Sequence, residues 1–155
     1  MIAQVEPAAA LLVPNGPVFR VLITGSRNWR GRAAVWVPLD RLLKHYGQIL
    51  VIHGDCPSGA DLLAREWAEE YEGEGAFQRR FPADWDGAGR GAGYVRNGEM
   101  VRFGADLALV FAKPCRKRTR WCPPGEHPSH GTADCVKQAR KSKISVKFCP
   151  YGMSW

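Results

Sequence analysis

Residues 18–27 read Val-Phe-Arg-Val-Leu-Ile-Thr-Gly-Ser-Arg, an apolar, β-branched run that ends abruptly in a small polar turn. A run without strict alternation is typical of a strand covered on both faces, as in a parallel sheet. In an open α/β sheet, ligands bind at the loop after such a strand. Gly25 would let the backbone approach a ligand, and Ser26 and Arg27 offer a hydroxyl, an amide N–H and a cation that suit phosphate. A plain strand-to-helix turn would look the same, so both interpretations stay open.

Four further apolar runs predict four more strands, and they lie at residues 49–53, 77–81, 107–111 and 144–148. Helical spacing of apolar residues recurs between the strands, in segments that open near residues 35, 60, 94 and 132. Strands that alternate with helices imply right-handed crossovers. The sequence therefore predicts the α/β class, as a Rossmann-like three-layer sandwich with a mainly parallel five-stranded sheet.

Two of the helical segments contain residues that predict a local feature of the helix. Pro38 falls inside the first, so that helix either begins there or is kinked. In the third, the predicted packing stripe leaves Arg96 and Asn97 off to the side, and it consists of Tyr94, Gly98, Val101 and Ala105. A Gly-rich connection is expected before this helix, at residues 82–93.

The chain of 155 residues has the size of one domain. We expect a flexible leader at 1–17, a nucleotide-binding domain at 18–148 with a basic insertion at 113–130, and a tail at 149–155. The leader lacks a basic start and has only a short apolar run, and no apolar run reaches the roughly 18 residues of a membrane span. The five cysteines are an odd number and two fall in α/β loops, which favours a reduced, cytoplasmic setting.

The formal net charge of +7 favours an anionic partner without choosing among nucleotide, nucleic acid and phospholipid. Small residues stand beside polar ones in each loop expected at the carboxyl ends of the strands or at the start of the following helix. Helix N-termini there would present free N–H groups to an anion. The candidate ligand-binding residues are Gly25, Ser26, Arg27, Gly54, Asp55, Ser58, Gly59, Asp61, Arg96, Asn97, Gly131 and Thr132. Neither a Walker A motif nor a complete G-x-G-x-x-G is present.

The spaced set Thr-Gly-Ser-Arg, His-Gly-Asp-x-x-x-Gly-Ala-Asp, Arg-Asn and Gly-Thr-Ala-Asp resembles the YspA-type proteins of the SLOG superfamily. The resemblance covers roughly residues 20–146. It implies a Rossmann-like domain that binds or senses a nucleotide or a nucleotide-derived ligand across these loops. Relatives include phosphoribohydrolases, which cleave the N-glycosidic bond of nucleoside monophosphates, and the DNA-binding protein DprA. Relatives also often form dimers, which leaves a homodimer open.

An enzyme of the phosphoribohydrolase kind is the first alternative. Arg96 aligns with the arginine of the hydrolase motif, so the resemblance makes it a candidate catalytic residue with a role toward phosphate or ribose. Cys135, however, stands where the catalytic glutamate belongs. Bond cleavage of this kind needs a carboxylate near the anomeric carbon. Asp61 and Asp134 are the candidates for that role, so whether the protein is an enzyme stays open.

Structural roles explain several of these residues equally well. Asp61 could cap its helix, with Ser58 as the N-cap residue. Gly59 could ease helix–strand packing, and Arg96 could be a solvated helix residue. Cys135 lies on an apolar stripe and is expected to be a core thiol.

The insertion contains Cys115, Cys122, His127 and His130, the residue types and number of a tetrahedral zinc site. Their spacing, C-x6-C-x4-H-x2-H, departs from usual structural sites, so a flexible loop with incidental cysteines and histidines is the alternative. A structural zinc ion is the one cofactor that the sequence suggests. The insertion also holds a cationic patch next to Trp121, which would suit single-stranded nucleic acid as in DprA-like proteins. The patch consists of Lys113, Arg116, Lys117, Arg118 and Arg120.

Overall fold

The computed structural model describes residues 16–149. Five parallel strands form one sheet in the order β3-β2-β1-β4-β5. The strands are β1 (Phe19–Gly25), β2 (Ile49–His53), β3 (Ala76–Arg80), β4 (Leu107–Phe111) and β5 (Ser145–Phe148). The predicted α/β class and parallel sheet are confirmed. The expected leader falls almost wholly on residues 1–15 and the expected tail almost wholly on 150–155, which lie outside the described residues.

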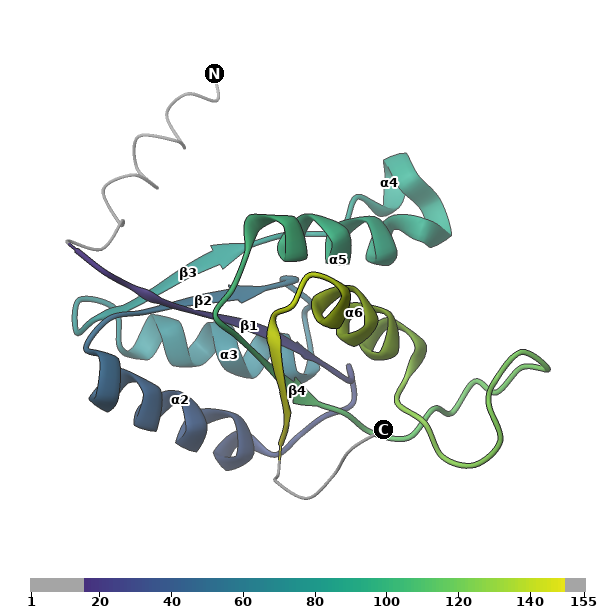
Figure 1. Ribbon diagram of the computed structural model, residues 1–155, viewed down its shortest axis with the longest axis horizontal. Helices are drawn as coiled ribbons and strands as arrows, with labels where there is room; N and C mark the ends of the chain where they lie inside the picture. The colour runs from purple at the N-terminus through teal and green to yellow at the C-terminus, as the bar shows by residue number, and fades with distance from the viewer. Residues whose placement is uncertain (1–15, 150–155) are drawn as a thin grey trace.

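Helices cover both faces of the sheet (Figure 1). On one face lie α2 (Arg32–Tyr46) and α3 (Gly59–Glu70), and on the other lie α5 (Ala92–Phe103) and α6 (His130–Lys141). The three layers are therefore those of a Rossmann-like sandwich, as the sequence predicts. None of the helices within residues 16–149 combines the length and the apolar character that a membrane crossing requires.

The buried strands explain why the apolar runs lack alternation. Val21 and Ile23 of β1 pack with α2 and α3, whereas Leu22 packs with α5 and α6. Both faces of the strand are thus buried at residues 21–24. Trp67 of α3 is the largest fully buried side chain in the described part of the chain, and its indole N–H donates to Asp40 Oδ1 at 2.8 Å.

The structure bears on three local expectations. The first helix begins at Arg32, well before Pro38, so it does not start at the proline. The Gly-rich connection at 82–93 contains a short helix, α4 (Trp85–Ala88), whose N-cap Asp84 accepts from the Gly87 amide at 2.9 Å. The predicted packing stripe holds at Gly98 and Val101, which are buried, and at Ala105, which packs against the core. It is wrong at Tyr94, which is 47% exposed, and α5 buries Arg96 and Asn97, which were expected off to the side.

The strand order places a switch point between β1 and β4. From β1 the chain steps outward through β2 and β3, then returns to pair β4 with the other side of β1. The loops after β1 and β4 consequently leave the sheet in opposite directions, and such a crevice is where ligands bind in open α/β sheets. In Figure 1 this carboxyl edge lies on the right, and the long segment between β4 and α6 extends from it.

Candidate functional site

A cleft of about 460 Å³ opens at this switch point. Its walls come from the loop after β1, the segment after β4, α4, and the first turns of α5 and α6. Eight of the twelve predicted ligand-binding residues line it, namely Gly25, Ser26, Arg27, Asp61, Arg96, Asn97, Gly131 and Thr132. The remaining four lie outside its lining: Gly54, Asp55, Ser58 and Gly59.

The Gly25-Ser26-Arg27 turn is built by close packing. A Cβ on Gly25 would lie 2.6 Å from the Phe111 carbonyl oxygen and 2.7 Å from the Ala60 Cβ, so only glycine fits without a shift. The Ser26 amide N–H donates to the Phe111 carbonyl at 3.0 Å. Arg27 is exposed, and its guanidinium carbon lies 5.3 Å from the centre of the Trp85 ring. Arg27 is therefore the residue of this turn that is free to meet a ligand.

Hydroxyl groups connect the turn after β1 to the start of α6. The buried Ser26 Oγ accepts from the Lys113 amide at 2.8 Å and lies 3.3 Å from Ser129 Oγ. Ser129 Oγ in turn donates to Thr132 Oγ1 at 3.0 Å, and Thr132 is 3% exposed. These hydrogen bonds fix the relative positions of three cleft walls. Gly131, next to Thr132, is exposed at the first turn of α6.

Arg96 and Asp61 organise the floor of the cleft around Gly54. The Arg96 guanidinium donates to the carbonyl of Gly54, to the carbonyl of Phe81 at 3.5 Å and to Asn97 Oδ1 at 3.2 Å. Asp61 Oδ2 accepts from the amides of Gly54 and Cys56, at 3.1 and 3.4 Å. Arg96 is 8% exposed and hence not a solvated helix residue. Gly54 itself lies buried beneath these two side chains.

Asn97 joins α5 to α6. Its Nδ2 donates to the Gly131 carbonyl at 3.1 Å and to Asp134 Oδ2 at 3.0 Å. Asp134 also accepts from Gln138 Nε2 at 2.8 Å, and it does not line the cleft. Of the two carboxylates considered for catalysis, the structure thus brings Asp61 to the cleft and holds Asp134 between the helices.

The other predicted residues shape the β2–α3 loop. Gly59 has φ +76°, and a Cβ there would clash with the Ser26 carbonyl oxygen and lie 2.7 Å from the Arg27 Cα. Packing therefore explains this glycine. Ser58 occupies the N-cap position of α3 without a side-chain capping bond. Asp55, at φ 53°, places Oδ1 3.9 Å from Arg65 Nη1 on α3.

Two thiols near the cleft are poor nucleophiles. Burial raises the pKa of Cys135 to about 12, and a hydrogen bond donated by the Thr24 hydroxyl to the sulfur offsets this only in part. Burial also raises the pKa of Cys56, and the negative charge of Asp61 adds to the effect. Because the thiolate is the reactive form, neither sulfur is suited to covalent catalysis near neutral pH. Cys135 is the core thiol that its apolar stripe indicates.

Sequence reasoning missed several lining residues. Trp85 and Tyr94 face the cleft while 48% and 47% exposed, and Arg90, Arg116 and Lys117 add cations. Together with Arg27 and Arg96, five basic side chains line the cleft among residues 16–149, against one carboxylate, Asp61. The basic insertion gave a signal for two of these cations. Trp85 lies in a glycine-rich connection, and nothing in the sequence there indicates whether its ring contacts a ligand or packs against the protein.

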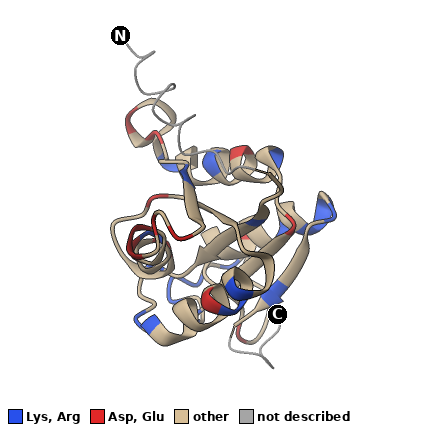
Figure 2. Ribbon diagram, turned by 90° about the vertical axis from the view of Figure 1, so that its left-hand side faces the viewer, with Lys and Arg blue, Asp and Glu red and all other residues tan. Residues whose placement is uncertain are grey.

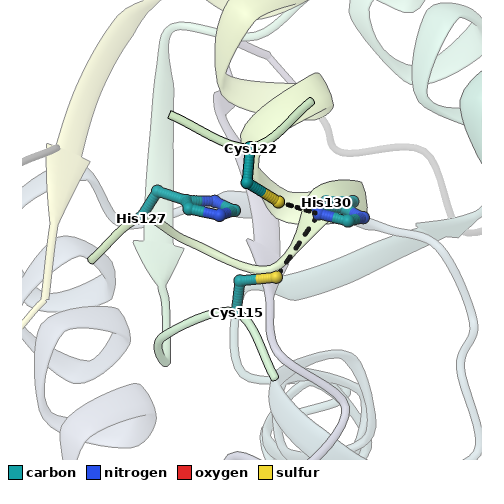
Figure 3. A group of neighbouring side chains, drawn as sticks. All are labelled: Cys115, Cys122, His127 and His130. Carbon is teal, nitrogen blue, oxygen red and sulfur yellow. Dashed lines mark hydrogen bonds between the residues drawn. The ribbon is translucent and has the colours of Figure 1, made fainter. Parts of the chain in front are cut away.

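The Cys and His residues of the insertion meet in one cluster (Figure 3). One potential ligand atom from each of Cys115, Cys122, His127 and His130 lies within 4.8 Å of the others. The hydrogen bond from the Thr119 amide to the Cys122 sulfur, with a further one from His130, lowers the pKa of that thiol to about 6. The four residues fit a metal ion in kind and in proximity. Within residues 16–149 all cysteines are free of disulfides.

The basic patch lies on the same insertion. Arg118 donates to the carbonyls of Pro123 and Gly125, at 2.6 and 2.7 Å, and so helps to fold the loop. Arg120 lies over the ring of Trp121, whose side chain is 80% exposed. Arg116 and Lys117 reach the cleft instead. The patch is therefore divided between holding the loop, lining the cleft and facing solvent.

Two comparisons with known proteins bear on this site. A model of the family described as YAcAr, the YspA, cpYpsA-related SLOG family, matches residues 19–87. The Gene 61 protein of Mycobacterium phage D29 is 41% identical over 130 residues, which cover 82% of this chain and 93% of that protein. The family match spans β1 to α4, and it includes the turn after β1 and the β2–α3 loop.

Proposed function

Because the chain belongs to the YspA, cpYpsA-related SLOG family, a family of nucleotide-related domains, we propose that its cleft binds a nucleotide or a nucleotide-derived ligand. The observation that carries the proposal is the cleft at the switch point, with five basic side chains and two exposed aromatic rings. Cations suit phosphate, and aromatic faces suit a nucleobase. The two kinds of group occur together in this cleft.

The phosphate end of the ligand would lie near Arg27, Arg116 and Lys117. All three side chains are exposed, so their cations are available to a ligand. The amides at the start of α6, around Gly131, add donors at the positive end of the helix dipole. Arg96 takes a positioning role, because its guanidinium is already bonded to backbone and Asn97 oxygens beneath the cleft.

The base end would lie against Trp85 and Tyr94. Stacking of a base on an aromatic ring contributes about 1–3 kcal/mol and tolerates different bases. The Arg27 guanidinium near Trp85 would then sit between the base and the phosphate positions.

Thermal shift measurements on the full chain test this proposal. The panel is AMP, ADP-ribose, NAD, a cyclic dinucleotide and a short single-stranded oligonucleotide. A ligand present at 100 times its dissociation constant should stabilise the fold by about 2.7 kcal/mol. We expect a rise in the melting temperature with one class of nucleotide ligand. Arg27→Ala should reduce this rise. Arg41→Ala is the control and should retain it, because Arg41 is exposed on α2 outside the cleft. The absence of a thermal shift with every ligand of the panel would overturn the proposal.

Hydrolysis of the N-glycosidic bond is a second candidate, favoured by Asp61 in the cleft. Asp61 is the carboxylate available among the described lining residues, and two backbone amides already bond to one of its oxygens. Release of free base from AMP, lost in Asp61→Asn, would support catalysis. Asparagine keeps an oxygen acceptor for the amides, so this variant separates chemistry from folding. Binding without base release would restrict the protein to sensing.

A third candidate is single-strand binding by the insertion, favoured by the exposed Trp121 beneath Arg120. Such binding would weaken steeply with salt, because each phosphate contact releases counterions. A shift with the oligonucleotide alone, removed by Trp121→Ala together with Arg120→Ala, would favour it. A response to mononucleotides that is unaffected by these two changes would exclude it.

A further inference from the structure

The Cys/His cluster is defined by Cys115, Cys122, His127 and His130 and lies between β4 and α6 (Figure 3). Both sulfurs point at the same imidazole nitrogen. Cys115 Sγ lies 3.3 Å and Cys122 Sγ 3.4 Å from His130 Nε2. One ring nitrogen has either one proton or one lone pair, so it makes one good hydrogen bond at a time. Convergence of two sulfurs on it is better explained by a cation that all three atoms share.

These distances agree with tetrahedral coordination. With bonds of about 2.3 Å to sulfur and about 2.0–2.1 Å to nitrogen, a sulfur and a nitrogen on one zinc ion lie about 3.5–3.6 Å apart. The two observed sulfur–nitrogen distances fall within a few tenths of an ångström of this value. The separation of at most 4.8 Å among all four ligand atoms requires only a small contraction of the loop.

His127 supplies an independent observation. Its ring is 8% exposed, and Nε2 is buried without a hydrogen-bond partner among the described residues. Its other nitrogen, Nδ1, lies 2.8 Å from the Pro128 carbonyl oxygen and must carry the proton to donate there. The tautomer therefore leaves a lone pair on Nε2. Metal-binding histidines are typically held by such a bond to a carbonyl, and an unpaired buried nitrogen is costly.

We propose that Cys115, Cys122, His127 and His130 bind one zinc ion. Two sulfur and two imidazole ligands in tetrahedral geometry are a donor set that favours zinc. Both thiols bind as thiolates, so binding forms two Zn–S and two Zn–N bonds and releases the thiol protons to solvent. The two negative charges balance the ion. All four positions are taken by protein, which makes the site structural rather than catalytic.

The ion supplies stability that the insertion lacks. None of the apolar clusters in the described part of the chain includes a residue of 113–130. The base of the loop is closed by the Pro114–Pro128 bridge and the hydrogen bond from the Cys115 amide to the His127 carbonyl. Beyond this base the segment is mostly exposed. A bound metal commonly stabilises a segment that has too small a core.

The zinc site also connects the insertion to the cleft. Cys115 and His130 belong both to the cluster and to the cleft lining, and Arg116 and Lys117 follow Cys115 directly. Because His130 is the first residue of α6, one ion fixes the basic loop relative to the helix that carries Gly131 and Thr132. Zinc would hold the cations of the loop in position at the cleft.

Metal content of the full chain, purified under reducing conditions from zinc-supplemented cells, tests the proposal. We expect about one zinc per chain in the wild type and in Cys56→Ser, and near-complete loss in Cys122→Ser. Cys56 is a matched control, since it is a free, half-buried cysteine outside the cluster. A wild type without stoichiometric zinc, or equal zinc in both variants, would overturn the proposal.

Cobalt replacement gives a second test that needs no variant. Co²⁺ added to the metal-free wild type should produce thiolate-to-cobalt charge-transfer absorption and the strong visible bands of a tetrahedral site, and zinc should abolish both. A weak octahedral spectrum, or a Cys115–Cys122 disulfide that persists in reductant, would contradict the proposal. Neither assay contains a nucleotide, so its outcome is independent of ligand binding in the cleft.

Discussion

Arg96 holds three parts of the molecule together from a buried position. Its guanidinium donates to Gly54 after β2, to Phe81 after β3 and to the neighbouring Asn97. In Arg96→Met these oxygens lose their donors, and we expect the free energy of unfolding to fall by roughly 2–4 kcal/mol in a urea titration.

Arg27→Met is the matched control for this change. Arg27 is exposed, and its replacement should change the free energy of unfolding by no more than about 0.5 kcal/mol. Equal free energies of unfolding for Arg96→Met and Arg27→Met would show that the hydrogen bonds of Arg96 do not stabilise the fold.

Gly59 is required by backbone geometry at the start of α3. Its φ of +76° disfavours a side chain, and an added Cβ would contact the backbone of Ser26 and Arg27. Gly59→Ala should therefore destabilise the fold by more than about 1 kcal/mol in thermal or urea unfolding.

Gly131→Ala, in contrast to Gly59→Ala, should not destabilise the fold. Gly131 lies in α6, has no positive φ, and an added Cβ would meet no atom within 4 Å. Alanine should leave stability unchanged or raise it by up to about 1 kcal/mol. If Gly59→Ala and Gly131→Ala changed stability by the same amount, the close packing of Gly59 against the turn after β1 would be contradicted.

At the level of elements, the sequence was most informative where burial alone decides the structure. The runs at 49–53 and 107–111 predict β2 and β4 with the observed bounds, because a continuous run of mostly apolar residues suits a strand covered on both faces. The buried face of α5 could be predicted only in part, because the burial of Arg96 and Asn97 gives no apolar signal. Apolar periodicity favours burying Tyr94, yet the carbonyls of Gly54 and Phe81 draw Arg96 inward, and those acceptors come from distant parts of the chain.

The residues of the candidate site could likewise be predicted only in part. Gly25 and Arg27 are recognisable because they follow a predicted strand, and both line the cleft. Gly54 and Gly59 look like ligand contacts in sequence, whereas close packing accounts for both. Trp85 could not be identified, since its place depends on a short helix that the glycine-rich sequence does not indicate.

The insertion between β4 and α6 should be separable from the core. Its base brings residues 115 and 127 together, so an Asn-Gly hairpin turn can replace 116–126. Since the apolar clusters exclude this segment, the metal-free variant and metal-free wild type should unfold cooperatively at the same urea concentration. Loss of cooperative unfolding in the variant would contradict this view of the element.

Across the whole molecule, the net charge of +7 does not by itself locate a ligand. Figure 2 shows Lys and Arg on helices, strands and loops, with Asp and Glu among them. General attraction would draw a polyanion to many of these positions. The cleft differs because its basic side chains accompany Trp85 and Tyr94 at the switch point of the sheet. The decisive measurement must therefore report where a ligand binds.

That measurement is a two-dimensional proton–nitrogen NMR titration of the full chain with AMP and with ADP-ribose, followed at the tryptophan indole N–H groups. The Trp85 signal should move saturably with ligand. The signals of Trp36 and Trp67 should stay in place, because their N–H groups donate to Leu63 and Asp40 inside the fold. No movement at Trp85, or movement confined to Trp121 on the insertion, would contradict nucleotide binding in the cleft.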